Sequence, residues 1–529
     1  MSLANPPPRS VRAPNHIVCS ADHVATSAGV EMFVRGGNAV DAAIATNAAM
    51  AVVAPHLCGL GGDLFALVHV DGAVHALNAS GRAGSGASAA DLRAEGHRTV
   101  PHRHHVGAVT VPGCVDGWVT LHERFASLPL DVLLAPAERL ASAGFLASAP
   151  LASVVGQLDE QSRQQLTELS EQVRRRGDIV RRPGAALVLA GIAATGRSSF
   201  YQGPFGQGLL EIGEGQFVAD DLAVSQAEWV EPLSSRAFGL DLHTIGPNSQ
   251  GYLTLGGARL ATSLDLPANP DDPQWAHLLI EAAIAAGRDR PDVLHEGADG
   301  AELLAAIDRR TGEIDVDRAT THHVPSANGD TTYLCTAGRS SSGVEMAVSL
   351  IQSNANGLGS HLVEPTTGIN LHNRGIGFSL EPGHPAELAP GRRPPHTLSP
   401  ALATQDDEIV GVLGTMGGDA QPQILLQLAA RLFHHRQSPA RAITAGRWAL
   451  RGPATGFDTW TSPESPSVLV EGHAPPEWAD GLTARGHRVA TTPAWDSTFG
   501  HAHAIVRGRS GSWIGFADPR TVVGSCAGG

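Results

Sequence analysis

Two adjacent threonines, Thr331 and Thr332, are the residues in this chain whose types and spacing most clearly permit chemistry. A threonine hydroxyl in mid-chain is a poor nucleophile, but it becomes a good one when the peptide bond before it is cut. The freed α-amine, whose ordinary pKa is about 7.7–8.0, then lies beside the hydroxyl and can act as its base. The alternative is an ordinary pair that opens a β-strand, so the meaning of these threonines depends on the rest of the sequence.

The part of the chain before the threonines is predicted to be rich in helices. Residues 24–54 are typical of two helices, and either Asn38 or Asp41 can cap the second one. A tight turn at Asp71 and Gly72 predicts a hairpin. The further predicted elements are the two hairpin strands at 65–70 and 73–78 and a mainly helical stretch at 115–195.

The part after the threonines is predicted to be rich in strands. Short strands are expected at 333–336, 345–351, 377–380, 409–413, 467–470, 487–490, 502–506 and 513–516, with one strong helix at 423–433. A helix-rich part joined to a strand-rich part indicates stacked sheets covered by helices.

Composition narrows the class of protein. The chain has 529 residues, 42% of them hydrophobic and 17% charged, which is enough for a large layered enzyme. Its net charge of −15 and the lack of a basic stripe argue against nucleic acid as a partner. No apolar run of about 18 residues predicts a membrane span, and no apolar leader is recognised. The five cysteines are odd in number and widely spaced, so we expect free thiols and a cytoplasmic protein.

Eight short segments, taken in order, resemble the γ-glutamyltransferase family of N-terminal-nucleophile hydrolases. They are 36–43 (GGNAVDAA), 55–65 (PHLCGLGGDLF), 111–118 (VPGCVDGW), 134–137 (LAPA), 331–332 (TT), 367–369 (TGI), 398–400 (LSP) and 417–418 (GG). Each segment is weak evidence alone, but their shared order spans nearly the whole chain.

The resemblance implies a proenzyme that cuts itself between Asp330 and Thr331. A large subunit, 1–330, and a small subunit, 331–529, would stay associated, and a dimer of that pair is one option. The implied fold class is α+β, as a four-layer αββα sandwich of the N-terminal-nucleophile hydrolase type.

The resemblance also assigns the reacting groups. Thr331 would attack an amide carbonyl, and Ser353 falls near polar residues that lie beside the nucleophile in the family. Gly417 and Gly418 match the pair that forms the oxyanion hole, where glycines let backbone N–H groups approach the developing charge closely. The alternatives are a structural serine on a strand and a plain turn before the helix.

Some candidate substrate-binding residues match the family pattern, and others depart from it. Arg82 falls where the family has an arginine that grips the substrate carboxylate, and a guanidinium can do so with two parallel hydrogen bonds. Thr397 and His396 stand where the family has two serines near that carboxylate, so His396 is a departure. Arg374 and Gly377 replace the glutamine and aspartate that bind the glutamyl α-amine in glutathione-cleaving members.

These residues support one main prediction and several alternatives. We expect a self-processing amide hydrolase or acyl transferase acting on a small carboxylate-bearing amide, such as the γ-glutamyl compound glutathione, with water or an amine as acceptor and no cofactor. Because Arg374 should repel an α-amine, an amidohydrolase or acylase for non-amino acyl groups of the oxamate or glutaryl type is an alternative. A non-catalytic relative that binds a small anion is another.

A metal hydrolase is a further alternative because histidines cluster in several places. The clusters are His102, His104 and His105; His322 and His323; His434 and His435; and His501 and His503. They lack matching cysteine or carboxylate spacing, so solvated histidines are the simpler interpretation and no metal site is predicted.

Overall fold

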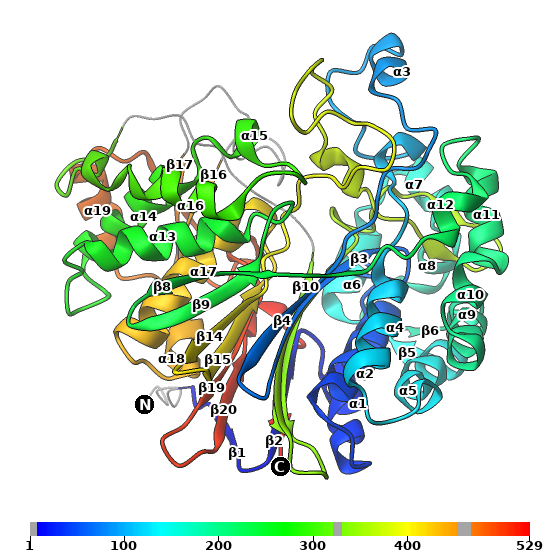
Figure 1. Ribbon diagram of the computed structural model, residues 1–529, viewed down its shortest axis with the longest axis horizontal. Coiled ribbons are helices and arrows are strands. Elements are labelled where there is room, and N and C mark those ends of the chain that lie inside the picture. Colours follow the sequence, from blue (N-terminus) through cyan, green and yellow to red (C-terminus); the bar gives the residue numbers. More distant parts are fainter. Residues whose placement is uncertain (1–7, 321–330, 452–466) are drawn as a thin grey trace.

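The computed structural model describes residues 8–320, 331–451 and 467–529, and most of its strands belong to two seven-stranded sheets (Figure 1). Sheet A contains, in spatial order, β1 (Val11–Ala13), β20 (Trp513–Ala517), β19 (Ala502–Arg507), β15 (Glu408–Thr415), β14 (Ala401–Gln405), β9 (Leu240–Ile245) and β8 (Pro232–Ala237). Sheet B contains β21 (Ser525–Gly528), β2 (His16–Ser20), β10 (Thr332–Arg339), β11 (Glu345–Ser353), β3 (Asp63–Val70), β4 (Ala73–Ala79) and β7 (Glu228–Val230). Neighbouring strands in both sheets run antiparallel.

Both sheets combine strands from before and after Thr331. In sheet B, β10 pairs with β2 on one side and with β11 on the other, and β11 pairs in turn with β3. In sheet A, β14 pairs with β9. The helix-rich and strand-rich parts of the sequence are therefore not two separate bodies, because they share the hydrogen bonds of the same sheets.

Helices cover the outer face of each sheet. Beside sheet B lie α1 (His23–Val34), α2 (Ala39–Val53), α4 (Cys114–Phe125), α5 (Leu130–Ala143) and α9 (Pro183–Thr195), which share one hydrophobic cluster with strand residues of that sheet (Figure 1). Beside sheet A lie α13 (Gly251–Ser263), α14 (Pro273–Gly287), α16 (Gly300–Asp308), α17 (Gln421–Ala429) and α18 (Pro439–Thr444). Between the sheets, Phe65, Tyr333 and Ile351 of sheet B share a buried cluster with Val412 and Ile505 of sheet A. The chain is thus a mixed α+β protein with a core between its sheets.

Shorter elements complete the described chain. The helices are α3 (Ala89–Ala94), α6 (Ala149–Gly156), α7 (Glu160–Gln165), α8 (Thr167–Gln172), α10 (Arg197–Tyr201), α11 (Pro204–Ile212), α12 (Ala219–Ala223), α15 (Arg290–Val293) and α19 (Glu477–Ala484). The small sheets pair β5 (Phe145–Leu146) with β6 (Ile179–Val180), β12 (Val363–Glu364) with β13 (Ile369–Asn370), and β17 (Ser467–Glu471) with both β16 (Trp448–Arg451) and β18 (Val489–Thr492).

Local signals in the first part of the sequence are confirmed. Asn38 caps α2 by accepting hydrogen bonds from the N–H groups of Val40 and Asp41, and the Asp41 side chain reaches back to the N–H of Asn38. Both candidate caps therefore act together as a capping box. The hairpin between β3 and β4 turns at Asp71 and Gly72, whose φ angles are +50° and +76°.

Two predictions in the second part are wrong in detail. Residues 377–380 form no strand: a 3₁₀ turn spans Arg374–Gly377, and the only pairing nearby is an isolated bridge at Ser379. A Cβ on Gly377 would lie 2.2 Å from the backbone oxygen of Pro395, so this glycine permits close packing of two segments rather than a strand. The helix predicted at 423–433 begins two residues earlier, and after Ala429 it continues as a π-helical turn.

All five cysteines are free, and four of them are buried. No helix in the described ranges combines the length and the apolar character that a membrane crossing requires.

Candidate active site

Thr331 immediately precedes β10 and lies beside Ser353, the last residue of β11. The strand register pairs Thr332 with Gln352, and the hydroxyl oxygens of Thr331 and Ser353 are 3.2 Å apart. Both side chains are buried, and Ser353 Oγ also accepts a hydrogen bond from the N–H of Ala355. The predicted nucleophile and its predicted neighbour are therefore in contact. Asp330, the residue before the predicted cut, lies outside the described residues.

The glycine pair lies at the end of β15, in the facing sheet. Gly417 and Gly418 have φ angles of +139° and +53°, values that residues other than glycine adopt only with strain. The backbone oxygen of Gly418 accepts a hydrogen bond from Nε2 of Gln250, which also donates to the backbone oxygen of Thr397. The pair thus forms a fixed turn that leads into α17.

The buried carboxylate of Asp63 contacts His396 and Arg374, and the sequence did not predict these contacts. Asp63 opens β3 and is paired in register with Ser353. Its Oδ2 lies 2.7 Å from Nε2 of His396 and 3.1 Å from Nε of Arg374. Nδ1 of His372 is 3.7 Å away from the same oxygen. Asp63, Arg374 and the two histidines are all buried, so we call these four residues the Asp63 cluster.

The charges in the Asp63 cluster follow from its hydrogen bonds. His396 Nδ1 accepts from the N–H of Leu398, so its Nε2 carries the proton that it donates to Asp63. Burial, and then the charge of Arg374, lower the pKa of His396 to about 4, so its imidazole is neutral near pH 7. Burial alone would raise the pKa of Asp63. The hydrogen bond from His396 and the positive charge of Arg374 outweigh burial and hold that pKa well below its usual range. Asp63 and Arg374 therefore form a buried ion pair.

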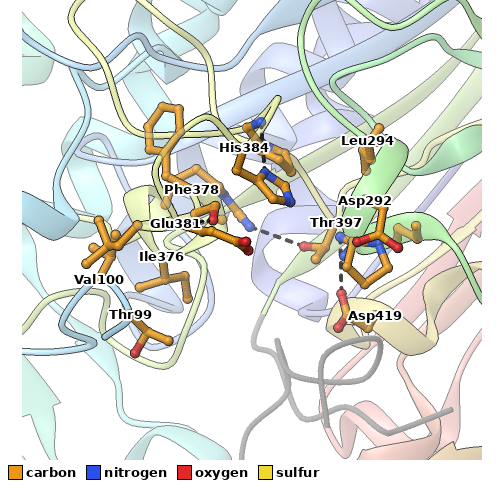
Figure 2. Close-up of a pocket in the computed structure, with 18 of the residues that line it drawn as sticks. Thr99, Val100, Asp292, Leu294, Ile376, Phe378, Glu381, His384, Thr397 and Asp419 are labelled. Atoms are coloured by element: carbon orange, nitrogen blue, oxygen red, sulfur yellow. Dashed lines mark hydrogen bonds and ion pairs between the residues drawn. The ribbon is translucent and has the colours of Figure 1, made fainter. Parts of the chain in front are cut away.

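Arg374 and Thr397 line a cavity of about 640 Å³. Nη1 of Arg374 lies 3.2 Å from the hydroxyl of Thr397. On the same cavity, Nη2 of Arg290 lies 3.3 Å from a carboxylate oxygen of Asp419. Dashed lines join Thr397 and Asp419 to these guanidinium groups in Figure 2. A cavity of this size with paired polar groups on its wall suits a small polar ligand.

The sequence lacks the family's amine-binding aspartate near Arg374 and leaves Asp419 or Glu364 as acids that could replace it, and the structure shows the surroundings of both. Arg374 is itself compensated by Asp63, and Asp419 on the cavity wall is paired with Arg290. Glu364, another acid near this stretch of sequence, is buried elsewhere and accepts hydrogen bonds from Thr367. Asp63 and Asp419 thus each face an arginine, and two further carboxylates, Asp292 and Glu381, also line the cavity.

Arg82 occupies a different place from the one its predicted role suggests. Its Nη1 bonds to Glu296 and to the backbone oxygen of Gly391, and its Nη2 lies 3.5 Å from Glu228. Among the described residues that line the cavity, Arg82 is not found, whereas Arg374 and Thr397 are. His396 lies behind that wall, bonded to Asp63. The carboxylate-binding role of Arg82 stays a prediction.

The histidine clusters of the sequence are not the groups that could hold a metal ion in the described structure. In the described part of the chain, groups able to offer three ligand atoms to a metal are Glu95 with His97 and His105, and His277 with Glu281 and His487. Only His105 comes from a cluster that the sequence suggested. His322 and His323 lie outside the described residues.

Comparison with known proteins defines the class to which this fold and site belong. The γ-glutamyltranspeptidase family model matches residues 25–527, and the chain belongs to this family. It is 35% identical to the oxamate amidohydrolase proenzyme of Klebsiella pneumoniae, over 94% of this chain and 96% of that one. It is 32% identical to the glutathione hydrolase-like YwrD proenzyme of Bacillus subtilis, over 97% and 98%. The cephalosporin acylase from Bacillus halodurans has a solved structure that matches with a TM-score of 0.89 at 32% identity, covering 100% of this chain and 99% of that one.

These matches confirm the family resemblance that the eight segments predicted. Within the family the chain is an amide hydrolase of the amidohydrolase and acylase kind, so the non-catalytic alternative is set aside.

Proposed function

We propose that this chain is a self-processing amide hydrolase that cuts itself between Asp330 and Thr331 and then cleaves a small amide whose acyl group carries a carboxylate. The observation that carries the proposal is the contact between the buried hydroxyls of Thr331 and Ser353, just before the first residue of β10. Ser353 would hold the Thr331 hydroxyl in one orientation, ready for attack once the α-amine is released.

The catalytic steps follow from the groups near Thr331. Its hydroxyl would attack the amide carbonyl while its α-amine takes the proton, and the backbone N–H groups of Gly417 and Gly418 would stabilise the oxyanion. The amine product leaves with that proton, and a Thr331 ester remains. Water, or an amine acceptor in a transfer reaction, then attacks the ester and regenerates the hydroxyl.

The two subunits produced by processing would remain associated. Residues 1–330 would supply β2 and β3, and residues 331–529 would supply β10 and β11 between them. Separation would expose the sheet hydrogen bonds and the buried cluster between the sheets, at a large cost in free energy. We assign the fold to the four-layer αββα sandwich of N-terminal-nucleophile hydrolases, supported by two sheets that share a core and carry helices outside. A cytoplasmic location agrees with the five free thiols.

For the acyl group, the cavity favours a carboxylate without an α-amine. Arg374 and Thr397 present a guanidinium and a hydroxyl on the cavity wall, a pair that suits a carboxylate. A cationic amine beside Arg374 would be repelled. The oxamate amidohydrolase among the relatives acts, by its name, on such an amine-free acid amide, which supports this choice.

A γ-glutamyl amide is the second candidate, and Asp419 is the observation that favours it. This buried carboxylate lines the cavity, and a substrate α-amine could compete with Arg290 for it. The name of the YwrD relative, glutathione hydrolase-like, points the same way.

A direct comparison of two chromogenic amides separates these candidates. The purified enzyme should cleave glutaryl-p-nitroanilide with a higher kcat/KM than γ-glutamyl-p-nitroanilide, because the two differ by the α-amine alone. A higher kcat/KM for the γ-glutamyl compound would reject the amine-free pocket and favour the second candidate. Asp419→Asn sharpens the test, since it should selectively reduce cleavage of the γ-glutamyl compound only if Asp419 binds the amine.

A further inference from the structure

A second polar cluster lies beside sheet A, among the helices that cover it. His277 and Glu281 are four residues apart on α14, so their side chains project from the same face of the helix. His487 follows α19 and precedes β18. All three side chains are buried, and one ligand atom from each lies within 4.8 Å of the others. We propose that His277, Glu281 and His487 bind a divalent transition-metal ion of the zinc class.

The hydrogen bonds of His277 prepare it as a ligand. Its Nε2 lies 3.0 Å from the backbone oxygen of Asp315, and a carbonyl oxygen can only accept, so Nε2 carries the proton. Nδ1 therefore has a lone pair, and it faces Nε2 of His487 at 2.8 Å. Metal-binding histidines commonly donate their other ring N–H to a carbonyl or carboxylate in this way, which fixes the tautomer.

Glu281 is a buried carboxyl group in contact with His487 and Thr320. Within the described ranges, the only ion-pair partner of Glu281 is His487, whose Nε2 is 3.9 Å from Oε1. The N–H and the hydroxyl of Thr320 donate hydrogen bonds to Oε2 of Glu281. Arg485 lies close to both histidines, but its guanidinium bonds to Gln274 and Gly481. A divalent ion would balance the buried carboxylate.

The ligand set selects the kind of ion. Two imidazoles and one carboxylate suit zinc and its transition-metal neighbours, whereas magnesium and calcium prefer oxygen ligands. Zn–N bonds of about 2.0–2.1 Å in a tetrahedral site put two nitrogens roughly 3.3 Å apart. The two histidines would therefore separate by about half an ångström, and the ring proton of His487 would move from Nε2 to Nδ1 so that Nε2 becomes a ligand. A water molecule would complete the coordination.

The ion would join elements that are distant in the sequence. It would connect α14 to the segment between α19 and β18, which come from the two sides of Thr331. Thr320, which bonds to Glu281 through both its N–H and its hydroxyl, would be held at the same point. The expected role is to stabilise this side of the protein, away from the reacting groups.

Metal binding to the full-length protein tests the proposal. After dialysis against a chelator, the protein is titrated with Zn²⁺ by calorimetry, with Tm as a second measurement. Co²⁺ is then used as a spectroscopic probe. We expect one Zn²⁺ per chain, a rise in Tm of a few degrees at saturating Zn²⁺, and the strong visible absorption of four-coordinate Co²⁺. A Co²⁺ spectrum with the weak absorption of the hydrated ion would overturn the proposal without any variant.

Matched variants locate the site. Glu281→Gln and His487→Gln keep the size of each side chain, and each should weaken Zn²⁺ binding at least about tenfold. His105→Gln removes a ligand from the exposed group of Glu95, His97 and His105 and serves as the control, which should leave the affinity unchanged. Loss of binding in the control with unchanged binding in the other two variants would mean that the surface group binds the ion, and the proposal would fail.

Discussion

Two buried aspartates, Asp63 and Asp518, both lie beside arginine and histidine, yet their surroundings differ in one respect. Each oxygen of Asp518 accepts two hydrogen bonds: Oδ2 from Arg447 and the N–H of Ala502, and Oδ1 from the N–H and guanidinium of Arg520. Arg520 also pairs with Glu471. Both oxygens of the Asp518 carboxylate are therefore fully paired, and Arg520 also lines a separate cavity of about 310 Å³.

Only one of the two carboxylate oxygens of Asp63 has hydrogen-bond partners among the described residues. Its Oδ2 bonds to Arg374 and His396, while its Oδ1 has no hydrogen-bond partner among the described residues. Arg374 in turn lines the cavity. A buried carboxylate whose two oxygens are both paired stabilises one structure, whereas one that keeps an unused acceptor oxygen and pairs with an arginine on a cavity wall is suited to a ligand site. We therefore interpret the Asp518 group as structural and the Asp63 cluster as functional.

The largest expected effect is on stability, in the Asp518 group. Arg520→Met should lower the free energy of unfolding by about 3–5 kcal/mol, because it leaves Glu471 and Asp518 buried with too little positive charge. Denaturant unfolding measures this loss. The processed protein that remains folded should keep its kcat/KM, and a matching fall in kcat/KM would show that the Asp518 group serves the reaction as well.

Asp63→Asn should chiefly reduce activity. The amide can still accept the hydrogen bond from His396, but Arg374 loses its compensating charge, and its guanidinium should shift away from Thr397. We expect kcat/KM for the preferred carboxylate amide to fall about 100-fold, equivalent to about 2.7 kcal/mol. A variant with unaltered kcat/KM but a much lower Tm would place Asp63 with Asp518 as a structural residue.

Arg374→Lys keeps the charge and removes the planar group. Lysine cannot hold a carboxylate with two parallel hydrogen bonds, so KM should rise about tenfold with little change in kcat. Steady-state kinetics on one substrate gives both constants. Arg82→Lys is the comparison variant: if Arg82 rather than Arg374 grips the carboxylate, the rise in KM will appear there instead.

Thr397→Val has the smallest expected effect. It removes one hydroxyl from the cavity wall with little change in volume, and a single hydrogen bond contributes about 1 kcal/mol. KM should therefore rise about fivefold. An unchanged KM would mean that this hydroxyl serves only to position Arg374.

The sequence predicted features that depend on neighbouring residues and missed those that depend on distant ones. The capping of α2, for which the sequence offers Asn38 or Asp41, and the turn at Asp71 and Gly72 are local features, and both predictions are confirmed. The strand expected at 377–380 was wrong because Gly377 is required for close packing against Pro395, a contact that hydrophobic pattern does not reveal.

The residues of the candidate active site show the same limit of prediction from sequence. Thr331 and Ser353 were found through the family resemblance, and adjacent strands bring them together. Asp63 lies in a segment that the resemblance included, but its partners Arg374 and His396 are more than 300 residues away in sequence. No local pattern could have joined them. The same holds for His277 and His487, which are 210 residues apart.

The central claim is that Thr331 becomes an N-terminal nucleophile, and intact mass with N-terminal sequencing of the purified protein tests it most directly. Wild-type protein should separate under denaturing conditions into two pieces, of which the smaller begins at Thr331, while Thr331→Ala should remain a single chain of 54.8 kDa without amidase activity. A wild-type enzyme that cleaves amides as one intact chain, or a Thr331→Ala variant still cut before residue 331, would contradict the account.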